Sequence, residues 1–127
     1  MKINELMQAV HENAVNHGWW EEEKSFGDII TLCHSELSEA FEEHREGHKP
    51  TEIYYKCKYC GDITNKQGLV CCAYKKMQPE GIPFELADCI IRILDYCGHE
   101  GIDIEEAIRI KHEYNKTRPY KHGGKKL

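Results

Sequence analysis

The 127-residue sequence lacks any long hydrophobic run, and its longest apolar stretches are only a few residues, such as Cys89-Ile90-Ile91. A transmembrane helix needs about 20 apolar residues, so we expect no membrane span and no membrane partner. Residues 1–5 also lack the apolar segment of a secretory signal peptide. These absences predict a cytoplasmic protein.

Positive charge is scarce over most of the chain. The sequence has 17 Lys and Arg residues against 22 Asp and Glu residues, which gives a formal net charge of -5. A general nucleic-acid-binding protein is usually basic, so we expect no nucleic acid as a partner. The exception is the segment 111–127, where six basic residues accompany a single acidic one. This segment is either a solubilising tail or a clamp for an anionic ligand over an acidic metal site.

Several familiar motifs are missing. The chain has no G-x-x-x-x-G-K-[ST] loop, so any binding of phosphate must use other groups. It has no Glu-x-x-His pair, which excludes the di-iron bundle, and no H-E-x-x-H metalloprotease motif.

Hydrophobic periodicity predicts four helices. They cover residues 3–16, from Ser25 to near Gly47, from about Pro83 to Gly98 or Gly101, and from Asp103 to before Pro119. We therefore expect an all-α fold, a four-helix bundle forming a single domain over residues 1–127. Residues 51–81 break the helical pattern and hold clustered cysteines, which indicates an insertion between the second and third helices.

The two central helices each carry an acidic pair at i, i+3. The pairs are Glu36 with Glu39, and Glu85 with Asp88. Each pair projects from one helix face, and four carboxylates from two packed helices can converge on hard divalent cations. The alternative for Glu36 and Glu39 is a solvated acidic face, because more glutamates follow them.

Together with the preceding Gly-Trp-Trp and the terminal Tyr-Asn-Lys-Thr-Arg-Pro-Tyr, these pairs resemble the MazG-like all-α nucleoside triphosphate pyrophosphohydrolases. The resemblance implies a helical bundle that assembles as a homodimer or homotetramer. It implies cleavage of nucleoside triphosphates to monophosphate and pyrophosphate with Mg²⁺, or Mn²⁺ in its place. It also implies that Glu36, Glu39, Glu85 and Asp88 are the metal ligands and catalytic residues. Residues 40–84 separate the two motifs, a connector longer than is usual in the family, and removing the cysteine-rich segment restores an ordinary length.

The candidate substrate-binding residues lie near the two ends of the chain. Lys111, Asn115 and Arg118 share one face if the fourth helix extends that far, and cations there suit a triphosphate. The alternative is a charged helix end that complements the helix dipole. Tyr114 lies in the same segment and can close over the substrate. Of Trp19 and Trp20, one is expected in the core and the other against a nucleobase, unless both belong to the core.

Seven cysteines are many for this length, and the odd count without a secretion signal argues against a disulfide scaffold. Cys33, Cys89 and Cys97 sit singly in helical patterns and are expected to be small buried residues. The remaining four, Cys57, Cys60, Cys71 and Cys72, lie close together in the sequence. The Cys57-x-x-Cys60-Gly61 half is typical of a zinc knuckle, so we expect structural Zn²⁺ at these four. A metal-free reduced loop and a redox dithiol are the alternatives.

The sequence therefore predicts an Mg²⁺-dependent nucleoside triphosphate pyrophosphohydrolase, a nucleotide-pool house-cleaning enzyme. The alternative is a catalytically idle, zinc-stabilised helical module that binds a protein partner through the insertion.

Overall fold

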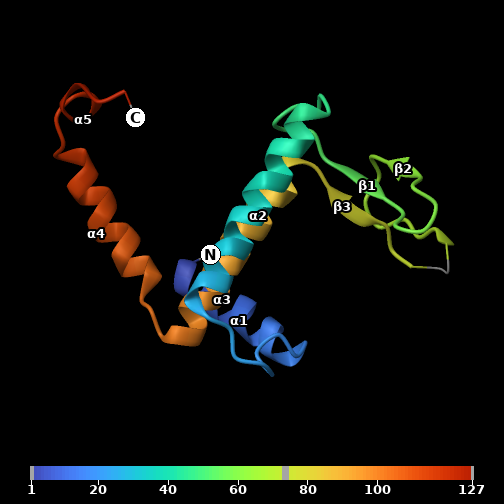
Figure 1. Ribbon diagram of the computed structural model, residues 1–127, viewed down its shortest axis with the longest axis horizontal. Helices are drawn as coiled ribbons and strands as arrows, with labels where there is room; N and C mark the ends of the chain where they lie inside the picture. Colours follow the sequence, from blue (N-terminus) through green and yellow to red (C-terminus); the bar gives the residue numbers. More distant parts are fainter. Residues whose placement is uncertain (1, 73–74, 127) are drawn as a thin grey trace. The chain divides into compact units, whose positions relative to one another are not determined.

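The computed structural model describes residues 2–72 and 75–126 (Figure 1). Its long helices are α1 (Ile3–Asn16), α2 (Phe26–Arg45), α3 (Ile82–Glu100) and α4 (Ile104–Lys116). A single helical turn, α5 (Lys121–Gly124), follows in the C-terminal segment. The four expected helices are confirmed, with small differences at their ends. In the described part of the chain, none of the helices combines the length and the hydrophobicity needed to cross a lipid bilayer.

The insertion between α2 and α3 contains a small antiparallel sheet. Its strands are β1 (Tyr54–Lys56), β2 (Ile63–Thr64) and β3 (Gln78–Glu80), in the order β2-β1-β3. Tyr55 of β1 lies opposite Thr64 on one side and Pro79 on the other. The expectation of an all-α fold is therefore correct only in part: the chain is mostly helical and carries a three-stranded sheet. These strands are too short for an alternating pattern to appear in the sequence.

The chain divides into two compact units, which we describe separately. Unit 1 comprises Met1–Glu22 and Leu94–Leu127, and unit 2 comprises Glu23–Ile93. In unit 1, Met7, Leu94 and Cys97 form a small buried core between α1 and the end of α3. Asn4 joins α1 to the start of α4, because its side chain donates to Asp103 Oδ1 at 2.8 Å. Asp103 in turn caps α4 by accepting from the backbone of Glu106.

Unit 2 is built on the pair α2 and α3, which run side by side (Figure 1). The helix α2 begins with a capping box: the Ser25 hydroxyl accepts from Asp28 N at 3.1 Å, and the Asp28 carboxylate accepts from Ser25 N at 3.3 Å. Cys33 of α2 and Cys89 of α3 are both buried, as expected, and lie in contact. The contact fixes which faces of the two helices meet.

Gly81 forms the junction between β3 and α3. Its φ is +120°, and a Cβ atom there would lie 2.5 Å from the backbone oxygen of Glu52. Only glycine fits both the backbone conformation and this close approach. The turn at Gly81 places the end of the sheet directly before the first turn of α3, where Glu85 lies.

Candidate metal sites

Three acidic side chains converge between α2 and α3. Glu36 and Glu39 lie one turn apart on α2, and Glu85 lies in the first turn of α3. One carboxylate oxygen from each lies within 4.8 Å of the others. Glu36 and Glu85 are buried, whereas Glu39 is exposed, so the group is open to solvent on one side. The spacing of a divalent-cation site is therefore present.

The fourth predicted carboxylate, Asp88, lies outside this group of three. It follows Glu85 by about one turn on α3, and its pKa is raised by burial and by the charges of Glu36 and Glu39. Asp88 therefore lies close enough to Glu36 and Glu39 for their charges to raise its pKa. Arg92, one further turn along, donates from Nε to Glu36 Oε1 at 2.7 Å. This ion pair joins Glu36 of α2 to Arg92 of α3.

The surroundings of Glu85 raise the pKa of its carboxyl group. Burial raises the pKa of its carboxyl group to about 8, and a hydrogen bond with Glu39 and the charges of Glu39, Asp88 and Glu80 add to the effect. Like charges crowded in a partly dry site disfavour ionisation of one member. A divalent cation removes this penalty, because it replaces repulsion between carboxylates by attraction to a shared ion.

Two further glutamates extend the cluster. Glu43 of α2 and Glu80 of β3 each place a carboxylate oxygen within 4.8 Å of the other and of Glu85. The Tyr54 hydroxyl on β1 donates to both oxygens of Glu43 at 2.9 Å. Glu43 follows Glu36 at i+7 and Glu39 at i+4, on the same face of α2. Helical spacing in the sequence is therefore enough to predict its position. Glu80 lies outside any helical spacing, so only the sheet reveals its position.

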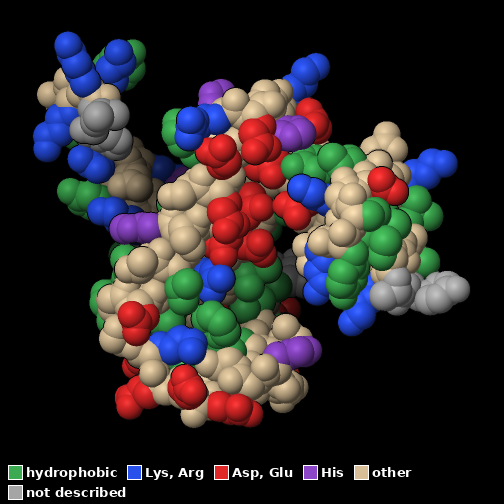
Figure 2. Space-filling view, turned by 45° about the vertical axis from the view of Figure 1, so that its right-hand side comes forward, with side chains coloured by type: hydrophobic (Ala, Val, Ile, Leu, Met, Phe, Trp, Pro, Cys, Tyr) green, Lys and Arg blue, Asp and Glu red, His purple; other side chains and the backbone are tan. Residues whose placement is uncertain are grey.

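The acidic residues form a visible surface feature. Figure 2 shows Asp and Glu side chains gathered in a strip on the helical part of unit 2, beside the lobe that carries the strands. We call the lobe of residues 54–80 the cysteine lobe. Unlike the acidic strip, it has more lysines than acidic residues, five against two. Unit 2 therefore presents surfaces of opposite charge.

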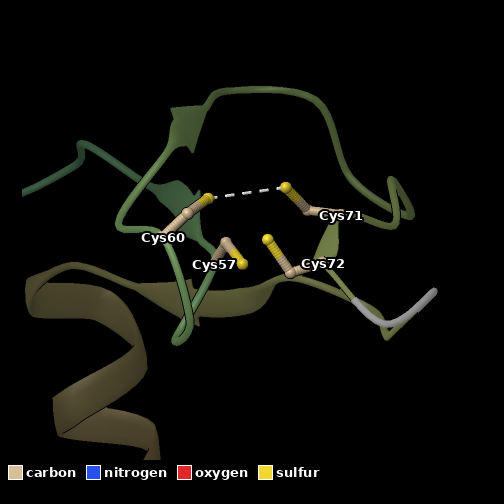
Figure 3. Close-up of side chains that lie close together, drawn as sticks. All are labelled: Cys57, Cys60, Cys71 and Cys72. Atoms are coloured by element: carbon tan, nitrogen blue, oxygen red, sulfur yellow. Dashed lines mark hydrogen bonds between the residues drawn. The ribbon is translucent and has the colours of Figure 1, made fainter.

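The four clustered cysteines meet in the cysteine lobe. The Sγ atoms of Cys57, Cys60, Cys71 and Cys72 all lie within 4.8 Å of one another and point to a common centre (Figure 3). The sulfur atoms of Cys60 and Cys71 are 3.6 Å apart, and all four thiols are free. A disulfide requires a sulfur–sulfur distance of about 2.05 Å, so this geometry suits a shared metal ion. The four residues can hold one metal ion.

Backbone amides prepare one of these sulfurs for a metal. The N–H groups of Cys60 and Tyr59 are directed at the Cys57 sulfur and lower the pKa of its thiol to about 6. The turn that aims them is closed by a hydrogen bond from Gly61 N to Cys57 O at 2.9 Å. The thiolate is the form that binds metal, so this turn favours Cys57 as a metal ligand near neutral pH.

No family model, curated protein or solved structure matches this chain. Unit 2 carries two kinds of cluster that could hold a metal ion: an oxygen-only cluster suited to hard cations and a sulfur-only cluster suited to soft ones.

The predicted substrate residues of the C-terminal half lie in unit 1. Lys111 and Asn115 are one turn apart on α4, and Lys111 Nζ lies 5.0 Å from the centre of the Tyr114 ring. The helix ends at Lys116, so Arg118 lies beyond it and does not continue the helical face. The expectation of one continuous face thus fails at Arg118, because Thr117 already caps the helix. Phosphate binding by these residues stays a prediction.

The two tryptophans are both partly buried in unit 1. Trp20 donates from Nε1 to Asp95 Oδ1 at 2.9 Å, and its ring stacks on His99 with centroids 3.7 Å apart and an angle of 4° between the planes. His11 Nδ1 contacts the same Asp95 oxygen at 2.8 Å. These contacts pack Trp20 within unit 1. A role for Trp19 or Trp20 against a nucleobase stays a prediction.

Proposed function

We propose that this protein is an Mg²⁺-dependent nucleoside triphosphate pyrophosphohydrolase that acts on (d)NTPs in nucleotide-pool house-cleaning. The observation that carries the proposal is the convergence of Glu36, Glu39 and Glu85 within 4.8 Å. Oxygen-only ligands from two helices suit Mg²⁺, or Mn²⁺, better than soft metals. The same residues carry the resemblance to the MazG-like family.

A divalent cation in this site would neutralise charge on the phosphate oxygens and acidify a bound water. The chain's own groups have distinct tasks in the proposal. Glu36 would be a ligand whose position is held by its ion pair with Arg92. Glu85 would release its proton on holding a cation, and Asp88 would supply a further oxygen ligand.

Glu39 is the residue proposed to orient the attacking water and accept its proton, because it is the exposed member of the group. The water oxygen attacks the α-phosphorus, and the bond from that phosphorus to the α,β-bridging oxygen breaks. The products are a nucleoside monophosphate and pyrophosphate. Positioning and charge stabilisation, without a covalent intermediate, account for the rate.

We also propose that the cysteine cluster holds structural Zn²⁺. Four thiolates around zinc at about 2.3 Å place neighbouring sulfurs ~3.8 Å apart, near the 3.6 Å between Cys60 and Cys71. With four protein ligands no position is open for substrate, so this metal has a structural role. The cysteine lobe buries few apolar side chains, and a metal would supply the folding free energy that a core supplies elsewhere.

The proposed partner is a second copy of the chain. The helices of unit 2 expose apolar faces that a monomer leaves in water, with Phe41 62% exposed and Ile90 55% exposed. On α2 the exposed positions follow a helical spacing, and so do those on α3. These positions are Phe26, Ile30, Leu37 and Phe41 on α2, and Leu86, Ile90 and Ile93 on α3. Pairing two such helix pairs would complete a four-helix bundle in a homodimer or homotetramer.

The activity is tested by pyrophosphate release from a panel of NTPs and dNTPs with Mg²⁺. We expect wild type to release pyrophosphate and monophosphate, and Glu85→Gln to lose at least ~100-fold in kcat because a metal ligand is removed. The matched control is Glu42→Gln, which removes one charge from an exposed position on α2 outside the cluster. It should retain wild-type turnover.

No pyrophosphate release from any nucleotide by a folded protein supplied with Mg²⁺ would overturn the hydrolase proposal. The alternative, an idle zinc-stabilised interaction module, would then be favoured. Equal turnover by wild type and Glu85→Gln would instead show that the activity comes from a different site.

The zinc proposal has its own test, which is the metal content of the purified chain. We expect one Zn²⁺ per chain in wild type and in Cys89→Ala, whose thiol lies on α3 outside the cluster. Cys60→Ser should lose most of its zinc, because a hydroxyl is a poor ligand for this ion. Retention of full zinc content by Cys60→Ser would contradict a four-cysteine site.

A further inference from the structure

A pocket of about 250 Å³ opens on the cysteine lobe. It shares no lining residue with the carboxylate site. Its walls come from two segments that are distant in the sequence, one around Cys57 and one leading into β3. The lining residues are Cys57, Lys58, Tyr59, Lys75, Lys76 and Gln78.

The cysteine turns build this pocket. Lys58 and Tyr59 occupy the turn closed by the hydrogen bond from Gly61 N to Cys57 O. On the other side, Cys71 N donates to the Lys75 oxygen at 3.1 Å, and Lys76 forms an isolated bridge with Val70. The lysines are therefore carried by the same two turns that carry the metal-binding cysteines, and a bound metal would fix both walls together.

The walls present positive charge without a carboxylate. Three of the lining residues are lysines and none is acidic. Among residues 2–72 and 75–126, no ion pair joins any of these three lysines to an acidic side chain. Cys57 also lines the pocket, but a divalent metal on the cluster offsets part of the thiolate charge. The three ammonium groups exceed the negative charge that the loaded cluster retains.

The hydrogen-bonding groups define the ligand. Lys58, Lys75 and Lys76 offer only donors, and the Gln78 amide and the Tyr59 hydroxyl add further donors. A small site rich in donors and positive charge suits an anion with several acceptor oxygens. Lys58 Nζ lies 5.2 Å from the centre of the Tyr59 ring, which keeps this ammonium group at the pocket wall.

We infer that this pocket binds a phosphate group. The inference does not depend on the hydrolase proposal, because it uses neither the carboxylates nor the substrate. The phosphate can belong to a small anion, such as pyrophosphate, or to a nucleic-acid backbone. These two sources share the same chemistry at the pocket, and the experiment separates them.

The test is calorimetric titration of the zinc-loaded full chain without Mg²⁺, using inorganic pyrophosphate in one arm and a short oligothymidylate in the other. The test variant changes Lys58, Lys75 and Lys76 to Gln. The matched control changes Lys49, Lys66 and Lys126 to Gln, which removes the same charge from exposed positions outside the pocket. We expect the test variant to bind at least ~10-fold more weakly than both wild type and the control.

Binding in the pyrophosphate arm with this pattern identifies a free phosphate ligand, and binding only in the oligothymidylate arm identifies a nucleic-acid backbone. The inference is overturned if wild type binds neither probe, or if both variants lose affinity equally. A shift experiment guards against misfolding of the test variant. In ¹⁵N-labelled wild type, the probe should shift amides of residues 57–59 and 75–78, and shifts confined to other residues would also overturn the inference.

Discussion

Burial changes the protonation of one side chain in the carboxylate site, that of Glu85. Its carboxyl group sits in a partly dry site beside Glu39, and its pKa is about 8 compared with an ordinary value of 4.5. Without metal, the folded protein therefore keeps a proton there that the unfolded chain releases at lower pH. The sign of the resulting pH dependence follows from this difference.

We expect the metal-free carboxylate site to destabilise the protein as pH rises from about 5 to about 8. Below that window the stability associated with Glu85 is fully present, and it is lost as the pH passes the folded-state pKa. Glu85→Gln cannot ionise, so its melting temperature should exceed that of wild type above pH ~8 and approach it near pH ~5. Thermal melts over this pH series, without Mg²⁺, measure the difference.

Added Mg²⁺ should reverse the order at high pH, because the ion stabilises the ionised carboxylates of wild type. Glu42→Gln is the control and should follow wild type throughout. A constant difference between Glu85→Gln and wild type at every pH would contradict the raised pKa.

Residue spacing in the sequence predicted most of the carboxylates in the acidic site. The i, i+3 pairs on the two central helices indicate that Glu36, Glu39 and Glu85 meet, because helical periodicity sets which side chains share a face. The position of Glu80 could not be predicted, since it depends on strand pairing between segments far apart in the sequence. The sequence also did not show which tryptophan packs inside the protein, because the partner of Trp20, Asp95, is distant along the chain.

The helices α1 and α3 approach closely at Gly98. A Cβ atom at Gly98 would lie 2.6 Å from the Cβ atom of His11. We expect Gly98→Ala to destabilise unit 1 by about 1–3 kcal/mol, because helix α1 must shift to make room. Denaturant unfolding measures the change.

The matched control is Gly27→Ala, a helical glycine whose added Cβ meets nothing closer than 3.8 Å. That substitution should be neutral or slightly stabilising, since alanine is the better helix former. Equal stability of the two variants would show that the approach of α1 to Gly98 is not rigid.

Helix ends were predictable and strands were not, for a physical reason. Ser25 and Asp103 are local signals, because an N-cap acts within its own first turn. The strands are two or three residues long, and their pairing requires chain segments to meet across the cysteine lobe. That lobe buries few apolar side chains, so hydrophobic periodicity carries little information about it.

The exposed apolar faces of α2 and α3 predict that the protein self-associates. We expect wild type to sediment as a dimer or tetramer, and Phe41→Glu combined with Ile90→Glu to sediment as a monomer, because charges cannot be buried unpaired in such an interface. The control is Thr31→Glu, an exposed position on α2 away from the apolar face. A monomeric wild type at micromolar concentration would contradict the prediction.

The strand pair β1–β3 reaches from one cluster to the other. Tyr54 at one end of β1 holds Glu43, Tyr54 lies opposite Glu80 in the ladder, and Cys57 follows the other end of the strand. Loss of metal from the sulfur cluster would therefore loosen two of the glutamates that surround Glu85. If both proposed metals bind, zinc shortage would therefore also weaken the oxygen site, and Mg²⁺-dependent turnover would fall with the zinc supply.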